Sequence, residues 1–188
     1  MIYTVSASLP TKNLHICILA SMKTPPLNLS EIFHTTVTEL CAAEKKYLKV
    51  YEQLARAAMT PEISAALSPE RTDLEQHASR LTLILEQEKL KASRIINPVH
   101  EQLIEMSKDK SGFVKQKSLM KDIQILHWAK LITQVKINDY ESLHSAALVL
   151  KLDKAEILLE QCAKEEANTY AYLLQIGRNI IYPAAAAE

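Results

Sequence analysis

Apolar residues recur at steps of three and four along most of the chain, the spacing that places side chains on one face of an α-helix. The first such stretch ends at Thr60-Pro61. Its apolar face consists of Phe33, Val37, Leu40, Tyr47, Tyr51, Leu54 and Ala58. Asn28 and Glu31 have the spacing of a capping box, which favours a helix start at that point. The pattern predicts a long first helix over residues 29–59.

Two proline signals follow the first helix. Thr60-Pro61 and Ser68-Pro69 each interrupt the helical period, because proline lacks the N–H group that a helix interior needs. We therefore expect either a short helix or a kink in this region. A second helix then extends from about residue 69 to 90, with Leu74, His77, Leu81 and Ile84 on its inner face.

Two more long helices are expected in the second half of the chain, over residues 115–150 and 153–181. The third offers an apolar column of Ile125, Trp128, Ile132, Val135 and Leu143, with a mixed column beside it that comprises His127, Leu131, Gln134, Asn138 and Glu141. The seam of the fourth comprises Ala155, Leu159, Cys162, Glu166, Thr169, Leu173, Ile176 and Ile180. A tight turn beginning at Lys151 is expected between them, and Pro183 is expected to end the last helix.

These elements predict an all-α fold, an up-down four-helix bundle with a short extra helix in the connection between helices 2 and 3. The extra helix begins at Asn97-Pro98, and a loop is expected over residues 108–112. Residues 1–27 hold three prolines without a sustained period and are interpreted as an N-terminal extension or arm. Residues 28–182 form the bundle, and residues 183–188 form a C-terminal tail.

The composition supports long helices and removes several classes of partner. Only two of the 188 residues are glycine, whereas sheets joined by tight turns need more. Basic and acidic residues balance at 22 each, so net charge favours neither nucleic acid nor an anionic membrane. No run approaches the roughly 18 apolar residues of a membrane-spanning helix. The three cysteines form no C-x-x-C pair, which indicates a reducing compartment. We expect a cytoplasmic protein without a nucleic-acid or membrane partner.

Acidic residues interrupt the inward faces of three predicted helices. Glu44, Glu141 and Glu166 each lie in such a column, although Glu165 is an alternative to Glu166 because helix rotation is uncertain at this level. The second helix adds Asp73 and His77, one turn apart. Buried carboxylates need neutralising cations, and carboxylates with imidazole are the ligands with which helical bundles hold two iron or manganese ions.

A structural interpretation of Glu44 remains open beside the metal interpretation. A buried acid at this position would be hydrogen-bonded to Tyr47, Tyr140 or a lysine side chain that reaches over it. The ligand pattern is also incomplete, since Glu166 is followed at the third position by Thr169 rather than by histidine. The chain shows no glycine-rich phosphate loop, no His-Glu-x-x-His and no nucleophile elbow, so conventional hydrolase or transferase chemistry has little support.

Four ordered blocks of sequence resemble the YciE/YciF family. They are Ala-Ala-Glu-Lys-Lys at 42–46, Ala-Arg-Ala-Ala-Met-Thr-Pro-Glu-Ile at 55–63, Asn-Asp-Tyr-Glu-Ser at 138–142 and Ala-Lys-Glu-Glu-Ala at 163–167. The resemblance covers roughly residues 25–180. It implies a ferritin-like four-helix bundle from a group of stress-associated bacterial proteins without an established reaction, often assembled as a dimer. Apolar residues outside the main seam of the fourth helix, such as Ile157, Leu158 and Leu174, also favour a homodimer.

The chain departs from the family's pattern at two places. The third helix of the family usually reads Glu-His-Tyr-Glu where this chain has Asn-Asp-Tyr-Glu at 138–141. An acidic pair usually stands where this chain has Thr72 and Asp73. The resemblance leaves Glu44, Asp73, Glu141, Glu165 and Glu166 as candidate ligands for one or two iron or manganese ions. His77 of the second helix is the candidate nitrogen donor, and oxygen or peroxide chemistry at the metal is the natural reaction. The alternative is a metal-free interaction or scaffold protein with a degenerate di-metal site.

Overall fold

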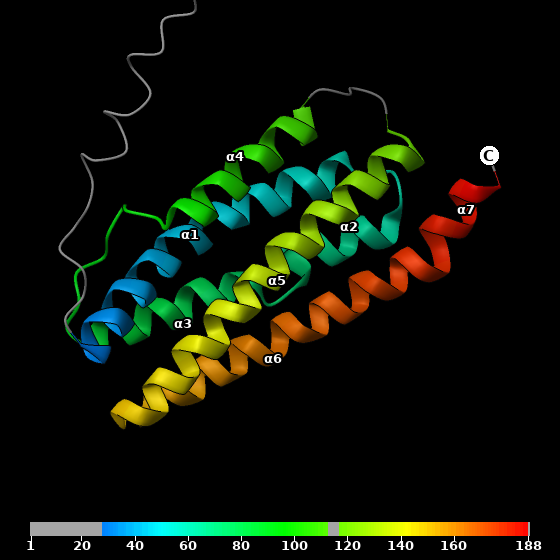
Figure 1. Ribbon diagram of the computed structural model, residues 1–188. Helices are drawn as coiled ribbons and strands as arrows, with labels where there is room; N and C mark the ends of the chain where they lie inside the picture. Colours follow the sequence, from blue (N-terminus) through cyan, green and yellow to red (C-terminus); the bar gives the residue numbers. More distant parts are fainter. Residues whose placement is uncertain (1–27, 113–116, 188) are drawn as a thin grey trace, which may run out of the picture.

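A computed structural model describes residues 28–112 and 117–187, and all regular structure within these ranges is helical (Figure 1). In chain order the elements are α1 (Leu29–Ala57), α2 (Pro61–Leu67), η2 (Pro69–Arg71), α3 (Leu74–Gln87), α4 (Pro98–Gly112), α5 (Leu119–Leu150), α6 (Asp153–Ile176), η3 (Gly177–Ile181) and α7 (Tyr182–Ala186). The prediction of an all-α protein is confirmed. The N-terminal extension expected over residues 1–27 lies outside the described residues.

Helix α1 begins where the sequence predicts. The Asn28 side chain accepts a hydrogen bond from the backbone N–H of Glu31 at 3.0 Å, which caps the helix. The predicted apolar face is buried along its whole length, and Glu44 is buried in the same column. The helix ends at Ala57, slightly before the expected residue 59.

Both proline signals interrupt the chain between α1 and α3. Helix α2 begins at Pro61 and the short η2 at Pro69, positions where a missing N–H costs nothing. The buried carboxylate of Asp122, on α5, accepts hydrogen bonds from the backbone N–H groups of Met59 and Thr60, at 2.8 Å each. This contact fixes the turn between α1 and α2. Helix α3 starts only after η2, so the expected second helix is shorter than residues 69–90.

The extra helix α4 is present between α3 and α5 and is longer than expected. The predicted loop over residues 108–112 is wrong, because α4 continues to Gly112. Lysine and serine oppose a helix only weakly, and the glycine stands at its last position, where its cost is low. Helix α5 begins after Ser118, whose hydroxyl accepts a hydrogen bond from the backbone N–H of Lys121 at 3.2 Å.

The tight turn between α5 and α6 and the end of the chain follow different rules. Lys151 adopts a left-handed conformation, with φ of 58°, and so closes the predicted turn. Pro183 does not end the last helix, because α6 passes through the π-helical η3 into α7 with Pro183 in the first turn of α7. Gly177 begins η3 in close contact with α5, since a Cβ at this position would lie 2.8 Å from Leu126 Cδ2.

Helices α1, α3, α5 and α6 form a ferritin-like four-helix bundle, as the sequence predicts, but the chain does not alternate up and down throughout, because α4 lies between α3 and α5. Helix α1 packs against α3 and α5, and α6 packs against the same two helices. Each of these neighbouring pairs runs antiparallel (Figure 1). Helix α4 carries the chain back along α1 and α5, and consequently α3 and α5 run in the same direction. The α5–α6 pair makes the most extensive contact.

The core consists of two apolar clusters with a polar layer between them. On α1 one cluster uses residues 33–41 and the other residues 43–55. On α5 they use residues 140–147 and 125–132, and on α6 residues 155–162 and 173–176. Glu44, Lys136 and Glu166 lie at the level where each helix passes from one cluster to the other, and all three are fully buried. Charged side chains therefore meet in the middle of the bundle.

The structure also bears on the expectations about cysteines, membrane-spanning helices and exposed apolar residues. Cys41 and Cys162 are buried as free thiols, in agreement with their place on helix seams. None of the described helices is long and apolar enough to cross a membrane. Ile157 and Leu174 are exposed on α6, whereas Leu158 is half-buried against the core. The homodimer stays a prediction.

Candidate metal centre

The carboxylate of Glu44 is held from the opposite helix α5. Its Oε1 accepts a hydrogen bond from the Tyr140 hydroxyl at 2.6 Å and lies 3.0 Å from Lys136 Nζ. Lys136 and Tyr140 are four residues apart on α5 and therefore reach the same point. Glu44 Oε2 is buried and has no hydrogen-bond partner.

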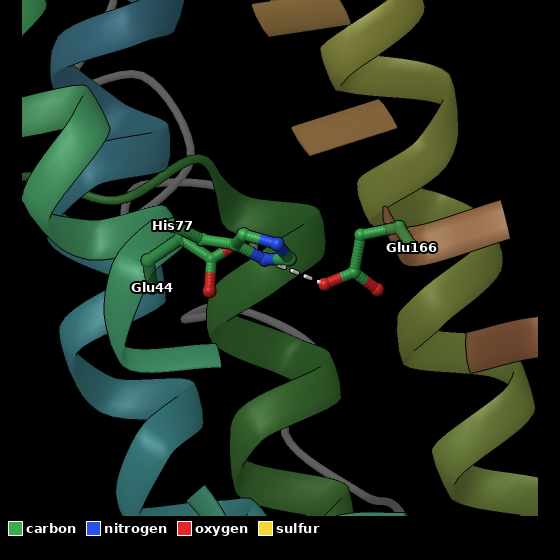
Figure 2. A group of neighbouring side chains, drawn as sticks. All are labelled: Glu44, His77 and Glu166. Atoms are coloured by element: carbon green, nitrogen blue, oxygen red, sulfur yellow. Dashed lines mark ion pairs between the residues drawn. The ribbon is translucent and has the colours of Figure 1, made fainter. Parts of the chain in front are cut away.

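A second glutamate, Glu166 on α6, reaches the same ammonium group. Its Oε1 accepts a hydrogen bond from Lys136 Nζ at 2.5 Å and lies 3.0 Å from Nδ1 of His77 on α3. Figure 2 shows this contact between the His77 ring and the Glu166 carboxylate. The distance between Nδ1 and Oε1 is short, but neither His77 Nδ1 nor Glu166 Oε2 has a hydrogen-bond partner of acceptable geometry.

The other nitrogen of His77 is held by Glu165. Its Nε2 lies 2.9 Å from Glu165 Oε2, and the guanidinium of Arg80 contacts both oxygens of Glu165, at 2.5 and 3.0 Å. An ionised carboxylate can only accept hydrogen bonds, so Nε2 of His77 carries a proton and donates a hydrogen bond to Glu165. In the neutral ring Nδ1 is then unprotonated, and its lone pair faces the interior of the bundle.

The charges of the centre are set by these contacts. Burial disfavours the charged form of Lys136, but the carboxylates of Glu166 and Glu44 hold its pKa well above the ordinary value. Burial likewise opposes ionisation of Glu166, but the Lys136 ammonium beside it holds the pKa of this carboxyl below its ordinary value. Burial against Glu44 raises the pKa of Tyr140 well above its usual range, so this hydroxyl stays protonated. Two carboxylates therefore share one ammonium group.

Two aromatic side chains, Tyr47 and Tyr51, lie next to the Lys136 ammonium group of this centre. Lys136 Nζ lies 5.9 Å from the ring centroid of Tyr47 and 5.4 Å from that of Tyr51, within range of cation–π attraction. The Tyr51 hydroxyl forms a hydrogen bond with Thr133 at 3.2 Å. Both tyrosines are buried, and burial raises the pKa of each hydroxyl above its usual range.

Glu44, His77 and Glu166 together fit a metal ion. Each offers one ligand atom, and the three atoms lie within 4.8 Å of one another (Figure 2). Two carboxylates and one imidazole are donors that iron and manganese accept. Buried oxygen and nitrogen atoms without partners are costly in a protein core, and a cation between them would satisfy them. The residues present therefore fit one ion.

The sequence-based site residues divide into three groups. Glu44, His77 and Glu166 meet in the bundle core, as predicted from their columns. Glu165 does not join them directly but holds His77 from outside. The expected inward positions of Glu141 and Asp73 are wrong, because both side chains are exposed.

The positions of Glu141 and Asp73 on their helices explain why these side chains are exposed. Tyr140 takes the inward position of α5, and the next residue, Glu141, is rotated about 100° away from it on the helix. The whole mixed column predicted on this helix, from His127 to Glu141, faces solvent. Asp73 is the residue that precedes the first turn of α3.

Sequence reasoning missed Lys136, the residue that contacts both glutamates. A signal was present, because Ile125, Ala129, Ile132, Lys136, Tyr140 and Leu143 recur at steps of three and four and are all buried. Arg80 was missed as well. It lies one turn after Gln76 on α3, and its role depends on Glu165 of another helix, which no local pattern indicates.

Comparisons with known proteins agree with this fold. Residues 28–186 match the family described as Domain of unknown function (DUF892). The E. coli stress protein YciF has a similar structure, with a TM-score of 0.75 and 23% sequence identity over 82% of this chain and 97% of that chain. YcfI from Rhodopseudomonas palustris is similar with a TM-score of 0.73 and 18% identity, over 81% and 96% of the two chains. No curated protein matches the sequence. The resemblance to the YciE/YciF family is confirmed.

Proposed function

The chain belongs to the DUF892 family, and from this premise we propose that its bundle binds one divalent iron or manganese ion between Glu44, His77 and Glu166. We further propose that the protein acts in stress protection in the cytoplasm. The similarity in fold to the E. coli stress protein supports the biological role, and the geometry of the three side chains supports the metal.

The observation that carries the proposal is the environment of His77 Nδ1. When the His77 ring is neutral, its Nε2–H donates a hydrogen bond to Glu165, and the Nδ1 lone pair faces Glu166 Oε1 at 3.0 Å. A lone pair and a carboxylate oxygen repel each other at this distance unless a cation lies between them. Glu44 Oε2 and Glu166 Oε2 are buried without partners in the same centre. A single divalent ion would relieve all of these conflicts.

Charge favours one ion over two. Glu44 and Glu166 contribute two negative charges, and Lys136 already cancels one of them. Two divalent ions would add four positive charges, and bundles that hold two ions surround them with four glutamates and two histidines. The Lys136 ammonium occupies the space between the carboxylates in the manner of a second cation. The remaining negative charge suits one metal ion.

The donor set also indicates the kind of metal. The ligands are carboxylate oxygens and one imidazole nitrogen, which suit iron and manganese. Thiolate ligation, typical of softer metals, has no support from Cys162, because burial raises the pKa of its thiol to about 12. Arg80 also contacts this sulfur, with Nη1 3.8 Å from Sγ.

The chain's own residues would prepare the centre for redox chemistry. A bound iron or manganese ion supplies one-electron chemistry with oxygen or peroxide. Tyr140 orients Glu44 through its hydrogen bond, and Glu165 fixes the tautomer and orientation of His77. Glu44, Lys136 and Glu166 are fully buried, so bulk water is excluded from the reacting groups.

Thermal unfolding with added metal tests this function. An ion that binds only the folded state stabilises it, by about 2.7 kcal/mol at a concentration of 100 times Kd. We expect Mn(II), or Fe(II) without oxygen, to raise the unfolding midpoint of the wild-type protein. The rise should disappear in His77→Asn and persist in the control His144→Asn, which changes a half-buried histidine on α5. No shift at millimolar metal would overturn the proposal.

A metal-free interaction or scaffold protein is the second candidate. The contacts of Lys136 with both glutamates favour it, because an ammonium group already neutralises part of the buried charge. In this case His77 is protonated at both ring nitrogens, and its Nδ1–H group faces Glu166 Oε1. The same melting experiment separates the two functions, because Mn(II) should not change the unfolding midpoint of a metal-free scaffold protein.

A homodimer belongs to the proposal as well. Ile157 and Leu174 are exposed on α6, and contact with a second copy of the chain would remove these side chains from water. Light scattering should give twice the 21.2 kDa of one chain. A mass of one chain at micromolar concentration would overturn this part.

A further inference from the structure

A row of three hydrogen-bonded groups lies beside the metal centre, outside the ligand set. The Tyr47 hydroxyl on α1 lies 2.8 Å from His100 Nδ1 on α4, and His100 Nε2 lies 2.6 Å from Asp139 Oδ2 on α5. Tyr47 and His100 are buried, whereas part of the Asp139 side chain reaches the surface. The row thus leads from the core to solvent.

The chemistry of the three groups fixes the direction of the protons. The Asp139 carboxylate can only accept, so His100 Nε2 carries a proton and donates it. Nδ1 of the neutral ring is then an acceptor, and the Tyr47 hydroxyl donates to it. Burial raises the pKa of Tyr47 well above its usual range, so the hydroxyl keeps its proton in the resting protein.

Two other tyrosines are buried near the centre, and their partners differ. Tyr51 meets the Thr133 hydroxyl, which is not a base. Tyr140 donates to Glu44, and a carboxylate is a weaker base than imidazole. Among the three, Tyr47 alone has an imidazole as its proton acceptor.

We propose that Tyr47 is a one-electron donor that transfers its hydroxyl proton to His100 as it is oxidised. Removal of an electron from a buried phenol leaves a positive charge that the core cannot solvate. Transfer of the proton to His100 leaves a neutral tyrosyl radical, and the imidazolium that forms is paired with Asp139. The buried charge is therefore compensated at the moment of oxidation.

The position of Tyr47 suggests its electron acceptor, in a step that rests on the proposed metal function. Tyr47 is one helical turn from Glu44, and its ring lies beside Lys136. Reduction of hydrogen peroxide to two waters takes up two electrons and two protons. A divalent iron or manganese ion held at the centre would supply one electron, and Tyr47 would supply the other. Both protons come from solvent, because the tyrosine's proton stays on His100.

The outer end of the row can exchange protons with water. His100 and Asp139 line a surface groove of about 440 Å³ together with Asn97, Val99 and Asn138. The proton held by His100 can exchange with water through this groove while the radical persists. Because peroxide receives both electrons within the protein, no hydroxyl radical needs to be released.

The electron-donor role can be tested on metal-free protein, which separates it from metal binding. The background carries Phe in place of the remaining tyrosines, Tyr3, Tyr170, Tyr172 and Tyr182. Laser-generated tris(bipyridine)ruthenium(III) serves as the oxidant, and electron paramagnetic resonance detects the tyrosyl radical. We expect loss of the signal in Tyr47→Phe and its retention in the matched control Tyr51→Phe.

His100→Gln tests the proton acceptor, because glutamine can still accept the hydrogen bond of Tyr47 but is not a base. We expect loss of the radical in this variant, with circular dichroism showing that it is folded. A radical signal that persists in Tyr47→Phe, or that is unchanged in folded His100→Gln, would overturn the proposal.

The peroxide step has its own experiment. Fe(II)-loaded protein mixed with one equivalent of hydrogen peroxide should give the Tyr47 signal, and Tyr47→Phe should instead release hydroxyl radical to a spin trap. Equal trapping in both proteins would overturn this step. Failure of the wild-type protein to bind Fe(II) at all would overturn the proposed metal function and leave the ruthenium result as the test of Tyr47.

Discussion

Lys136 and Glu166 form an ion pair at the centre of the bundle, with Nζ 2.5 Å from Oε1 and neither side chain exposed to solvent. Glu44 shares the same ammonium from the other side, at 3.0 Å. Two buried carboxylates therefore depend on one cation of the chain. The predictions below follow from this excess of negative charge and from the orientation of His77 next to it.

Lys136→Met removes the ammonium group and keeps a side chain of similar length. It leaves Glu44 and Glu166 buried without a counter-ion, so we expect the free energy of unfolding at neutral pH to fall by about 3–5 kcal/mol. Urea denaturation measures this loss. A change smaller than about 1 kcal/mol would show that the pair is not buried in solution.

A matched variant separates charge from packing at the same position. Glu44→Gln and Glu166→Gln, combined with Lys136→Met, remove all three charges together. Removing every partner of a buried ion cluster is far less costly than removing one. The triple variant should therefore be more stable than Lys136→Met alone, whereas equal stability would mean that the methionine simply packs badly.

Glu165→Gln tests the support of His77. Glutamine can hold the ring in place with its amide oxygen but does not increase the basicity of the imidazole as a carboxylate does. Loss of such a support lowers metal affinity by about 10–100-fold. Glu160→Gln is the control, because Glu160 is on the same helix and forms an ion pair with the exposed Lys164. Equal Mn(II) affinity in both variants would contradict a role of Glu165 in supporting His77 as a metal ligand.

The pH dependence of stability follows from Glu166 and Lys136. The folded pKa of Glu166 is lowered, so its contribution is present above the unfolded pKa of about 4.3 and is lost as pH falls through the folded value. The folded pKa of Lys136 is raised, so its contribution is complete below about 10.4 and is lost only as pH rises through the folded value. Unfolding experiments should show a loss of stability below about pH 4 that Glu166→Gln reduces. Equal acid sensitivity of the variant and the wild-type protein would contradict this assignment.

The sequence predicts the fold better than the site, for a physical reason. Helical period, two proline breaks and the Asn28 cap are local signals, and each appears in the structure at the expected place. Which side chains of α5 face the core depends on the rotation of the helix about its axis. A rotation by one residue changes the inward face, and the helical period does not fix this rotation when a polar column lies next to an apolar one. The sequence pattern consequently predicts an inward Glu141, whereas the structure buries the neighbouring Tyr140.

Contacts between helices are the part that the sequence does not reveal. Lys136 lies in a buried column and could have been found by the argument that identified Glu44. Of the three partners that the structural interpretation of Glu44 predicts, Tyr140 and a lysine, Lys136, contact this carboxylate, whereas the Tyr47 hydroxyl contacts His100. The contact between Tyr47 and His100 joins helices that are distant in sequence, and no spacing rule predicts it.

The central claim is that Glu44, His77 and Glu166 hold one divalent ion. Calorimetric titration of metal-free protein with Mn(II), without oxygen, tests it most directly, because it gives the number of ions per chain as well as their affinity. The account predicts one Mn(II) per chain and loss of this binding in Glu44→Gln and in Glu166→Gln, while the control Glu141→Gln, an exposed acid on α5, binds as the wild type does. Absence of binding, two ions per chain, or equal binding in all of these variants would contradict it.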